Sequence, residues 1–273
     1  MNNLVMFCLS MESKHLNTIK NFNYFPVGLG DGNFSNEWFL DNKGENISQK
    51  NKHYGEYTFH YWLWKNYLDK INEDWIGFCQ YRKFWSIEKN NLFPSAINEL
   101  KPMVLTEIPK SYENFDVILG ELHTINQLKI MKFLKKGFRI IIKNPSYLFN
   151  KNKRNIKFHF DLMHGYKNLD RAIDLLDVED KNDFKEFVST QTSFNPHNMF
   201  ICKSKNTLIK YYSVVFPWLE RCEKLFGFEN LKEFGQIRIY TFLAERFMSY
   251  WFQKNTKSKT MPILFYDIRK DIQ

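Results

Sequence analysis

The sequence predicts an α/β fold with a mainly parallel central sheet, flanked by helices and followed by a helical C-terminal third. Short apolar runs bounded by polar residues alternate with longer stretches whose apolar residues recur at helical spacing. Neither a Gly/Ser-rich linker nor an internal repeat interrupts the 273 residues. We therefore expect a single domain over residues 1–273.

The expected strands are short apolar runs that begin and end beside polar residues. They cover residues 4–9, 75–79, 115–119, 139–142, 199–203 and 263–266. In sheets of this class, ligands bind beyond the carboxyl ends of the strands. The residues that directly follow each strand are therefore the first candidates for a site.

The expected helices lie between these runs. The first contains four residues at the spacing that places them on one buried face: Tyr57, Tyr61, Trp64 and Leu68. Further helices are expected over residues 126–136, 160–176, 208–226 with a break before Pro217, and 235–254. The last of these should bury one apolar side, formed by Ile239, Leu243, Phe247, Tyr250 and Trp251.

The composition favours an anionic partner. Lys and Arg outnumber Asp and Glu by 39 to 30, which gives a formal net charge of +9 and suits nucleic acid, an acidic membrane face or a phosphorylated small molecule. Aromatic residues make up 18% of the chain. An AT-rich gene accounts for part of this excess, and the remaining rings suit a pocket that stacks on a flat or sugar-like ligand.

The cysteines and the N-terminus predict a cytoplasmic protein. The four cysteines are far apart and lack metal-type spacing, so we expect buried thiols in a reducing compartment: Cys8, Cys79, Cys202 and Cys222. The N-terminal residues lack the features of a signal peptide. No apolar run approaches the roughly 18 residues of a membrane span.

Common phosphate-binding and metal-binding motifs do not occur in the sequence. There is no Walker loop, no G-x-G-x-x-G after a strand and no H-E-x-x-H. The glycines of "GLGDG", residues 28–32, are more typical of a tight turn than of a phosphate cradle.

The run "IGFCQYRKFW" delivers Tyr81, Arg82 and Lys83 at the end of an expected strand. Many enzymes that use nucleotide-sugars have an Asp-x-Asp pair there, which holds a metal ion on the diphosphate. Here the arginine and lysine can neutralise a diphosphate directly, and Tyr81 can stack on a base or a sugar. A surface arginine beside a core tyrosine is an equally good interpretation.

A polar loop, residues 41–51, directly precedes the aromatic helix. Burial explains the rings of that helix but leaves Asp41, Asn46, Lys50 and Asn51 without a packing role, together with Lys65 on another face. These side chains are therefore candidates for the wall of a binding site.

Two later stretches carry further candidates. In "SFNPHNMFICKS", His197 and Asn198 enter an expected strand after a proline, although a loop that satisfies its own backbone is the simpler interpretation. On the last helix, Arg238 and Glu245 share a face opposite the apolar side, where a solvated polar face is the simpler interpretation. His164 is more typical of a packing histidine than of a catalytic one.

Six stretches, taken in order, resemble a bacterial family of capsule and exopolysaccharide glycosyltransferases that has been described as a domain of unknown function. They are "FPVGLG", "DNKGENISQKN", "YGEYTFHYWLWKN", "WIGFCQYRKFW", "PHNMFICKS" and "RIYTFLAERFMSYW". The resemblance implies a GT-A-like fold and the transfer of a sugar from a nucleotide-sugar to a capsule, lipooligosaccharide or exopolysaccharide glycan.

The resulting hypothesis assigns roles to these candidates. Residues 1–120 would form the nucleotide-sugar-binding half and residues 121–273 the acceptor-side half. The donor, expected to be a UDP-sugar, would contact Asp41, Asn46, Lys50, Asn51, Lys65, Tyr81 and Arg82. Glu245 is the candidate base for the acceptor hydroxyl and Asp116 the reserve. The candidates for contact with the acceptor or the donor sugar are His164, His197, Asn198 and Arg238.

We expect no required cofactor, because cationic side chains can stabilise a leaving diphosphate, although a lone Asp could still hold Mg²⁺ or Mn²⁺. The expected acceptor is a glycan or a lipid-linked oligosaccharide, with peripheral contact at the cytoplasmic face of the inner membrane. Two rival hypotheses are a non-catalytic partner in a polysaccharide assembly complex and a nucleic-acid-binding protein. The second should show a basic stripe or an RNP-type aromatic strand, and neither is evident, so we expect no nucleic-acid partner.

Overall fold

The computed structural model describes residues 4–87, 94–127 and 145–271. The strand expected at residues 139–142 and most of the helix expected at 126–136 lie outside the described residues. The chain divides into two compact units. We call them the sheet unit (Met1–Glu121, Met199–Ser213 and Phe252–Gln273) and the helical unit (Leu122–Asn198 and Val214–Trp251).

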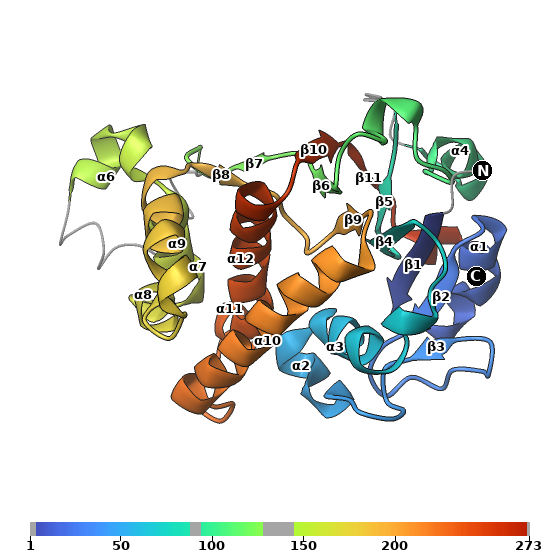
Figure 1. Cartoon of the computed structure of the whole chain (residues 1–273), viewed down its shortest axis with the longest axis horizontal. Helices are drawn as coiled ribbons and strands as arrows, with labels where there is room; N and C mark the ends of the chain where they lie inside the picture. Colours follow the sequence, from blue (N-terminus) through green and yellow to red (C-terminus); the bar gives the residue numbers. More distant parts are fainter. Residues whose placement is uncertain (1–3, 88–93, 128–144, 272–273) are drawn as a thin grey trace. The chain divides into compact units, whose positions relative to one another are not determined.

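The sheet unit contains one mixed, mainly parallel sheet (Figure 1). Its strands are β1 (Leu4–Ser10), β2 (Phe25–Gly28), β3 (Phe39–Leu40), β4 (Trp75–Gln80), β5 (Lys83–Trp85), β6 (Val117–Gly120), β9 (Phe200–Cys202), β10 (Ser258–Met261) and β11 (Ile263–Phe265). Neighbours follow the order β10-β6-β9-β4-β1-β2-β3, with β5 beside β4 and β11 beside β5. β9 runs antiparallel to β4 and β6, and β5 antiparallel to β4 and β11, whereas the other pairs are parallel.

This sheet confirms the predicted fold class. Five of the predicted runs coincide with β1, β4, β6, β9 and β11. The sequence missed β2, β3, β5 and β10, which have two to four residues each. Such short strands carry too few apolar residues to show a period of two.

The helices of the sheet unit cover both faces of the sheet. They are α1 (Leu16–Asn21), α2 (Asn51–Tyr54), α3 (Tyr57–Asn66) and α4 (Ile97–Leu100). Side chains alternate along β1, so Cys8 joins the cluster that contains Ile19 of α1, while Phe7 points to the other face. There Phe7 contacts Phe78 of β4 and Phe59 of α3, with ring centroids 6.0 and 5.3 Å apart. The cysteines are buried as free thiols, as predicted.

The aromatic helix α3 is buried more widely than its sequence spacing predicts. Tyr57 is fully buried as expected, but Tyr61 and Trp64 are only half-buried, and Phe59 and Trp62 are buried instead. Phe59 packs against Phe7 of the sheet, and the loop before the helix lies against Trp62. The indole N–H of Trp62 donates to the Lys43 carbonyl oxygen at 2.7 Å.

The helical unit contains a two-stranded sheet and a group of helices. It contains β7 (His123–Thr124), β8 (Ser193–Phe194), α6 (Ser146–Phe149), α7 (Ile156–His164), α8 (Asn168–Ile173), α9 (Val178–Thr190) and α11 (Phe234–Ile237). Two long helices, α10 (Lys205–Phe226) and α12 (Ile239–Asn255), contribute residues to both units.

Two helix predictions need correction. The helix expected over residues 160–176 is divided into α7 and α8 at Gly165, whose φ of +104° suits glycine and ends the first helix. The expected break before Pro217 is absent, since α10 continues through this residue. Pro217 and Ser213 are both exposed, so water can hydrate the carbonyl group that lacks a helical donor.

The apolar side predicted for the last helix is buried, but the solvated polar face expected opposite it is wrong. Thr241 and Glu245 are only 4% and 9% exposed. The helical unit covers this side of α12 with its own aromatic and polar residues. Phe194, for example, lies 4.2 Å from the guanidinium carbon of the neighbouring Arg246.

Candidate functional site

Four parallel strands end level with one another at one edge of the sheet. Leu9 of β1 is in register with Gln80 of β4, Ser10 with Gly28 of β2, and Gly28 with Leu40 of β3. The residues that follow therefore form a row from Tyr81 to Asp41, roughly 14 Å long at the usual strand spacing. This edge is the position at which sheets of this class bind ligands.

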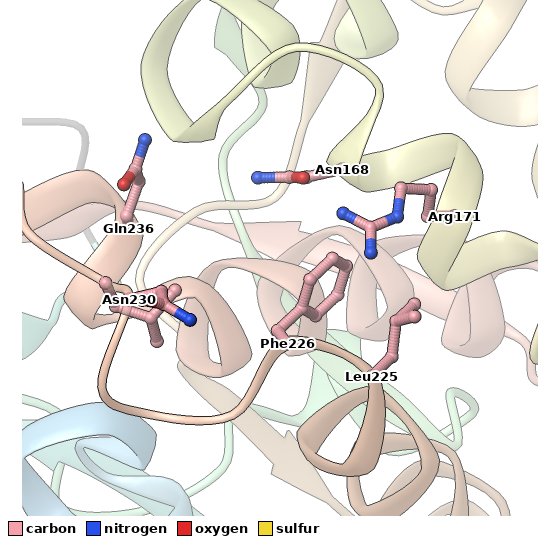
Figure 2. Close-up of a pocket in the computed structure, with 7 residues that line it drawn as sticks. Asn168, Arg171, Leu225, Phe226, Asn230 and Gln236 are labelled. Atoms are coloured by element: carbon pink, nitrogen blue, oxygen red, sulfur yellow. The ribbon is translucent and has the colours of Figure 1, made fainter.

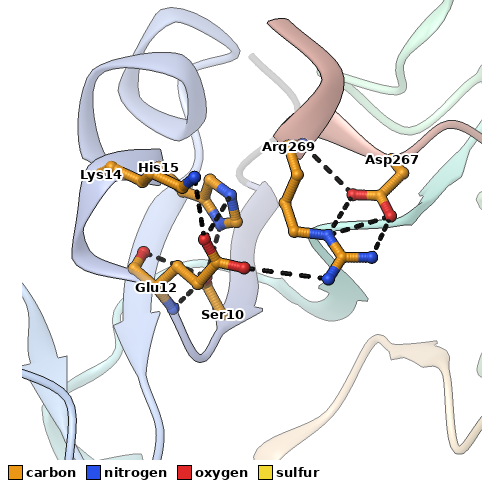
Figure 3. A network of polar contacts seen from close by, with 6 residues as sticks. All are labelled: Ser10, Glu12, Lys14, His15, Asp267 and Arg269. Atoms are coloured by element: carbon orange, nitrogen blue, oxygen red, sulfur yellow. Dashed lines mark hydrogen bonds and ion pairs between the residues drawn. The ribbon is translucent and has the colours of Figure 1, made fainter. Parts of the chain in front are cut away.

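A buried polar cluster follows β1. The Ser10 hydroxyl accepts a hydrogen bond from the Glu12 amide at 3.0 Å and lies 2.7 Å from Nδ1 of His15 (Figure 3). His15 is fully buried, and burial lowers its pKa, so the imidazole is neutral at pH 7. The cluster fixes the turn after β1 and the plane of the histidine ring.

Tyr81, at the end of β4, packs against this cluster, and Arg82 lies beside the Tyr81 ring. The Tyr81 ring stacks on His15 with centroids 5.2 Å apart and planes inclined by 26°. The exposed guanidinium of Arg82 lies 4.8 Å from the Tyr81 ring centroid, and that of Arg269 lies 5.5 Å from it. Arg269 donates to both oxygens of Asp267, and this pairing lowers the pKa of Asp267. The end of β4 thus presents two guanidinium groups beside one ring.

A buried carboxyl group lies at the other end of the row. Asp41 follows β3 and is 1% exposed, and its Oδ2 has no hydrogen-bond partner among the described residues. Burial raises its pKa, an effect that a hydrogen bond from Thr58 opposes. The Asn51 amide donates to Oγ1 of Thr58 at 3.1 Å, and its Oδ1 lies beside Gly30 in the turn after β2. Asp41, Asn51 and the turn after β2 therefore belong to one group.

The remaining donor candidates of the loop have local partners. Asn46 caps its own turn by accepting hydrogen bonds from the amide and hydroxyl of Ser48. Lys50 lies 5.8 Å from the Tyr54 ring centroid. Lys65 lies 3.5 Å from a carboxylate oxygen of Glu45 and 4.1 Å from the Trp64 ring centroid. Their donor-binding roles stay predictions.

Asp116 lies at the opposite edge of the sheet. Both Ile76, near the start of β4, and Val117 of β6 are in register with Cys202. Asp116 directly precedes Val117 and is therefore level with the start of β4 rather than with its end. Its carboxylate accepts a hydrogen bond from the Lys257 amide at 2.8 Å. The structure does not bring the reserve base together with the row of strand ends.

Glu245 holds a strained turn in the helical unit. His197 and Asn198 both have positive φ, +78° and +52°, which costs on the order of 1–3 kcal/mol for each such residue. The His197 amide donates to one oxygen of Glu245 at 2.5 Å, and the other oxygen pairs with the buried guanidinium of Arg246. Both carboxylate oxygens are thus engaged, which suits a residue that positions the turn better than a free base.

Two further candidates of the helical unit make packing contacts. His164 is buried, stacks 4.1 Å from the Phe242 ring and lies 2.9 Å from the Gly235 carbonyl oxygen. Since that oxygen can only accept, Nδ1 of His164 carries the proton. The Arg238 guanidinium carbon lies 5.9 Å from the Phe234 ring centroid. The packing interpretation of His164 agrees with these contacts.

A cavity of about 290 Å³ opens within the helical unit between α8 and the end of α10. Figure 2 shows the Arg171 guanidinium extending toward the Phe226 ring, 4.9 Å from its centroid. Amide side chains complete the polar lining: Asn168, Asn230 and Gln236. This lining offers hydrogen bonds to hydroxyl or carboxylate groups and a ring face to an apolar surface.

Sequence reasoning missed Ser10, His15, Asp267 and Arg269. The signal for Ser10 was its position directly after the strand expected over residues 4–9. Asp267 directly follows the strand expected over residues 263–266, but its approach to the end of β4, together with that of Arg269, depends on the long-range pairing of β11 with β5.

No three His, Cys, Asp or Glu side chains gather as a metal site within the residues that the structure describes. Of the helices in this same part of the chain, none is long and apolar enough to cross a membrane.

A mixed sheet with mainly parallel strands and helices on both faces defines a GT-A-like fold. The solved structure described as "WbbM bifunctional glycosytransferase apo structure" is similar, with a TM-score of 0.71 and 20% sequence identity. The match covers 97% of this chain and 45% of that chain, so this chain spans less than half the length of that protein.

The chain belongs to the family described as "Domain of unknown function (DUF4422)", whose model matches residues 8–256. No curated protein matches the chain.

Proposed function

We propose that the protein is a glycosyltransferase that moves a sugar from a nucleoside-diphosphate donor, expected to be a UDP-sugar, to a capsule, lipooligosaccharide or exopolysaccharide glycan. The row of strand ends from Tyr81 to Asp41 carries the proposal, since it has arginine at one end and a buried carboxyl group at the other. The GT-A-like fold, shared with a protein described as a glycosyltransferase, supports it.

The arginine end of the row suits the diphosphate of such a donor, and the Asp41 end suits its nucleoside. Arg82 can give two parallel N–H bonds to phosphate oxygens and balance the charge that develops on the leaving diphosphate. At the other end, Oδ2 of Asp41 can accept from a ribose hydroxyl or a base N–H, and Asn51 is linked to Asp41 through Thr58. Tyr81 offers a ring for stacking at the arginine end of the row.

Fewer residues support the proposed acceptor side. His197 and Asn198 remain candidates for sugar contact because their strained turn is held in place by Glu245. Transfer to a lipid-linked oligosaccharide, in a cytoplasmic protein that contacts the inner membrane peripherally, is part of the same proposal.

A thermal-shift screen with UDP-, GDP-, CMP- and dTDP-sugars tests the proposal. A ligand that binds the native state raises the melting temperature, and we expect the UDP-sugars to do so. Release of UDP in the presence of glycan acceptors then tests transfer. If no nucleotide-sugar raises the melting temperature, the proposal is wrong.

Replacing Arg82 separates the diphosphate site from the fold. The exposed Arg82→Ala variant should fold normally but bind UDP about 10- to 100-fold more weakly, because a charge-assisted hydrogen bond is worth roughly 1.5–3 kcal/mol. Titration calorimetry measures the affinity. The control is Arg221→Ala, which removes an arginine paired with Asp177 in the helical unit. Normal turnover by folded Arg82→Ala would exclude the diphosphate role.

A further inference from the structure

We propose that Arg269 is a second diphosphate-binding residue, which acts beside Arg82 and is held ready by Asp267 until a ligand phosphate replaces that carboxylate. Arg269 lies in η7 (Ile268–Asp271), a 3-10 helix that follows β11. This inference rests on the proposed function and deepens it, because it names a phosphate-binding residue outside residues 8–256, the part of the chain that the family model matches.

The backbone attaches this segment firmly to the end of β4. The Tyr266 amide donates to the Arg82 carbonyl oxygen at 3.2 Å, and the Ile268 amide donates to the Tyr81 carbonyl oxygen at 3.3 Å. Arg269 therefore follows directly after a residue that is hydrogen-bonded to the candidate site. Its position does not depend on side-chain contacts alone.

The Tyr81 ring gives the two arginines a common, rigid support. Arg82 and Arg269 lie 4.8 and 5.5 Å from its centroid, and the ring itself stacks on the buried His15. Ser10 in turn contacts His15 at 2.7 Å. Guanidinium groups that are fixed before the ligand arrives lose less entropy when they bind it.

The Asp267 carboxylate occupies a position at which Arg269 stabilises a negative charge. Its carboxylate accepts hydrogen bonds from Nε and Nη2 of Arg269. A second carboxylate, that of Glu12, lies 3.9 Å from Nη1 of Arg269 (Figure 3). Arg82 also contributes to the low pKa of Asp267, which places this carboxylate in the field of both arginines. A phosphate group can accept the same paired N–H bonds that the carboxylate now accepts.

The arginine site is accessible to a ligand. The side chains of Arg269 and Asp267 are 42% and 21% exposed, so ligand oxygens can reach the guanidinium without unfolding the segment. Asp267 and Glu12 lie beside this guanidinium group in the unliganded protein, and a phosphate that replaces Asp267 takes over its paired N–H bonds. The row of strand ends then leads away from the arginines toward Asp41.

The test compares UDP with uridine, which lacks the phosphates, on purified full-length variants. We expect Arg269→Gln to weaken UDP binding at least 10-fold and to leave uridine binding unchanged, while Arg269→Lys restores part of the loss because it keeps the charge but not the paired donors. Inorganic pyrophosphate should compete with UDP for wild-type protein and less well for Arg269→Gln. Melting temperatures confirm that each variant is folded, and Arg221→Ala is the matched control.

The outcomes distinguish this inference from the proposed function. If UDP binds wild-type protein and Arg82→Ala weakens it, but Arg269→Gln does not, the function stands and the inference is wrong. An equal loss for uridine and UDP in Arg269→Gln would also overturn it, since the residue would then support the fold of the site rather than bind phosphate. If wild-type protein binds neither UDP nor any other nucleoside diphosphate, both proposals fail.

Discussion

At the scale of single residues, Asp41 allows ligand binding to be separated from stability. Its buried carboxyl group has an oxygen without a partner among the described residues, an arrangement that costs free energy in the unliganded fold. Such a group is retained at a site when a ligand supplies the missing hydrogen bond. Its replacement should therefore change binding and stability in opposite directions.

We expect Asp41→Asn to weaken uridine and UDP binding about equally and to stabilise the unliganded fold at neutral pH. Burial raises the pKa of Asp41, so the folded state keeps a proton that the unfolded state has already lost. The stability of the wild-type protein therefore falls as pH rises from about 4 through the folded pKa. The asparagine variant lacks this loss, so its advantage should grow over that window. Urea unfolding at several pH values measures it, and an advantage that shrinks with pH would contradict the assignment.

Glu245 offers a second test at this scale. Glu245→Gln keeps an acceptor for the His197 amide but leaves the buried guanidinium of Arg246 without its ionic partner. Breaking a buried pair in this way typically costs about 3–5 kcal/mol. We expect a loss of that order in the free energy of unfolding, with Glu229→Gln, an exposed position, as the control. Unchanged stability together with lost transfer would instead identify Glu245 as a base.

At the scale of elements, the sequence pattern predicted the strands whose residues are almost all apolar. It missed strands whose conformation depends on pairing with a distant part of the chain. The runs at β1 and β4 are apolar throughout and were found from sequence. β10 reads Ser-Lys-Thr-Met, and its strand conformation depends on parallel pairing with β6. The same distinction applies to the site. Tyr81 directly follows a predicted strand, and Asp41 was predicted from the polar loop before the aromatic helix, whereas Arg269 reaches the site only after β11 pairs with β5.

The helix α10 tolerates its proline at a cost that can be measured. Pro217 lies inside the helix on an exposed position, so an alanine there restores a helical hydrogen bond and buries nothing new. A proline in a helix interior costs up to about 3 kcal/mol relative to alanine. We expect Pro217→Ala to raise the free energy of unfolding by about 1–3 kcal/mol in urea titrations. Lys210→Ala, exposed on the same helix, is the control, and a destabilised Pro217→Ala would show that α10 requires its proline.

At the scale of the whole molecule, the proposed function assigns the two arginines at the end of β4 to the leaving diphosphate. Transfer is therefore expected to continue in a chelator, because Arg82 and Arg269 balance the charge that a metal ion would otherwise balance. Turnover measured with and without EDTA tests this. Complete loss in EDTA that Mn²⁺ restores would overturn the prediction.

The order of the strands in the sheet has a consequence for synthesis of the chain. Ile76 of β4 pairs with Cys202, and Phe84 of β5 pairs with Leu264. At roughly 5–20 residues per second, the ribosome delivers β9, which pairs with one edge of β4, roughly 6–25 s after β4 itself, and it delivers β11, which pairs with β5, later still. During that interval the nascent chain exposes apolar strand edges that can pair with other chains. We therefore expect efficient production of this protein to depend on chaperones that cover those edges until the last strands arrive.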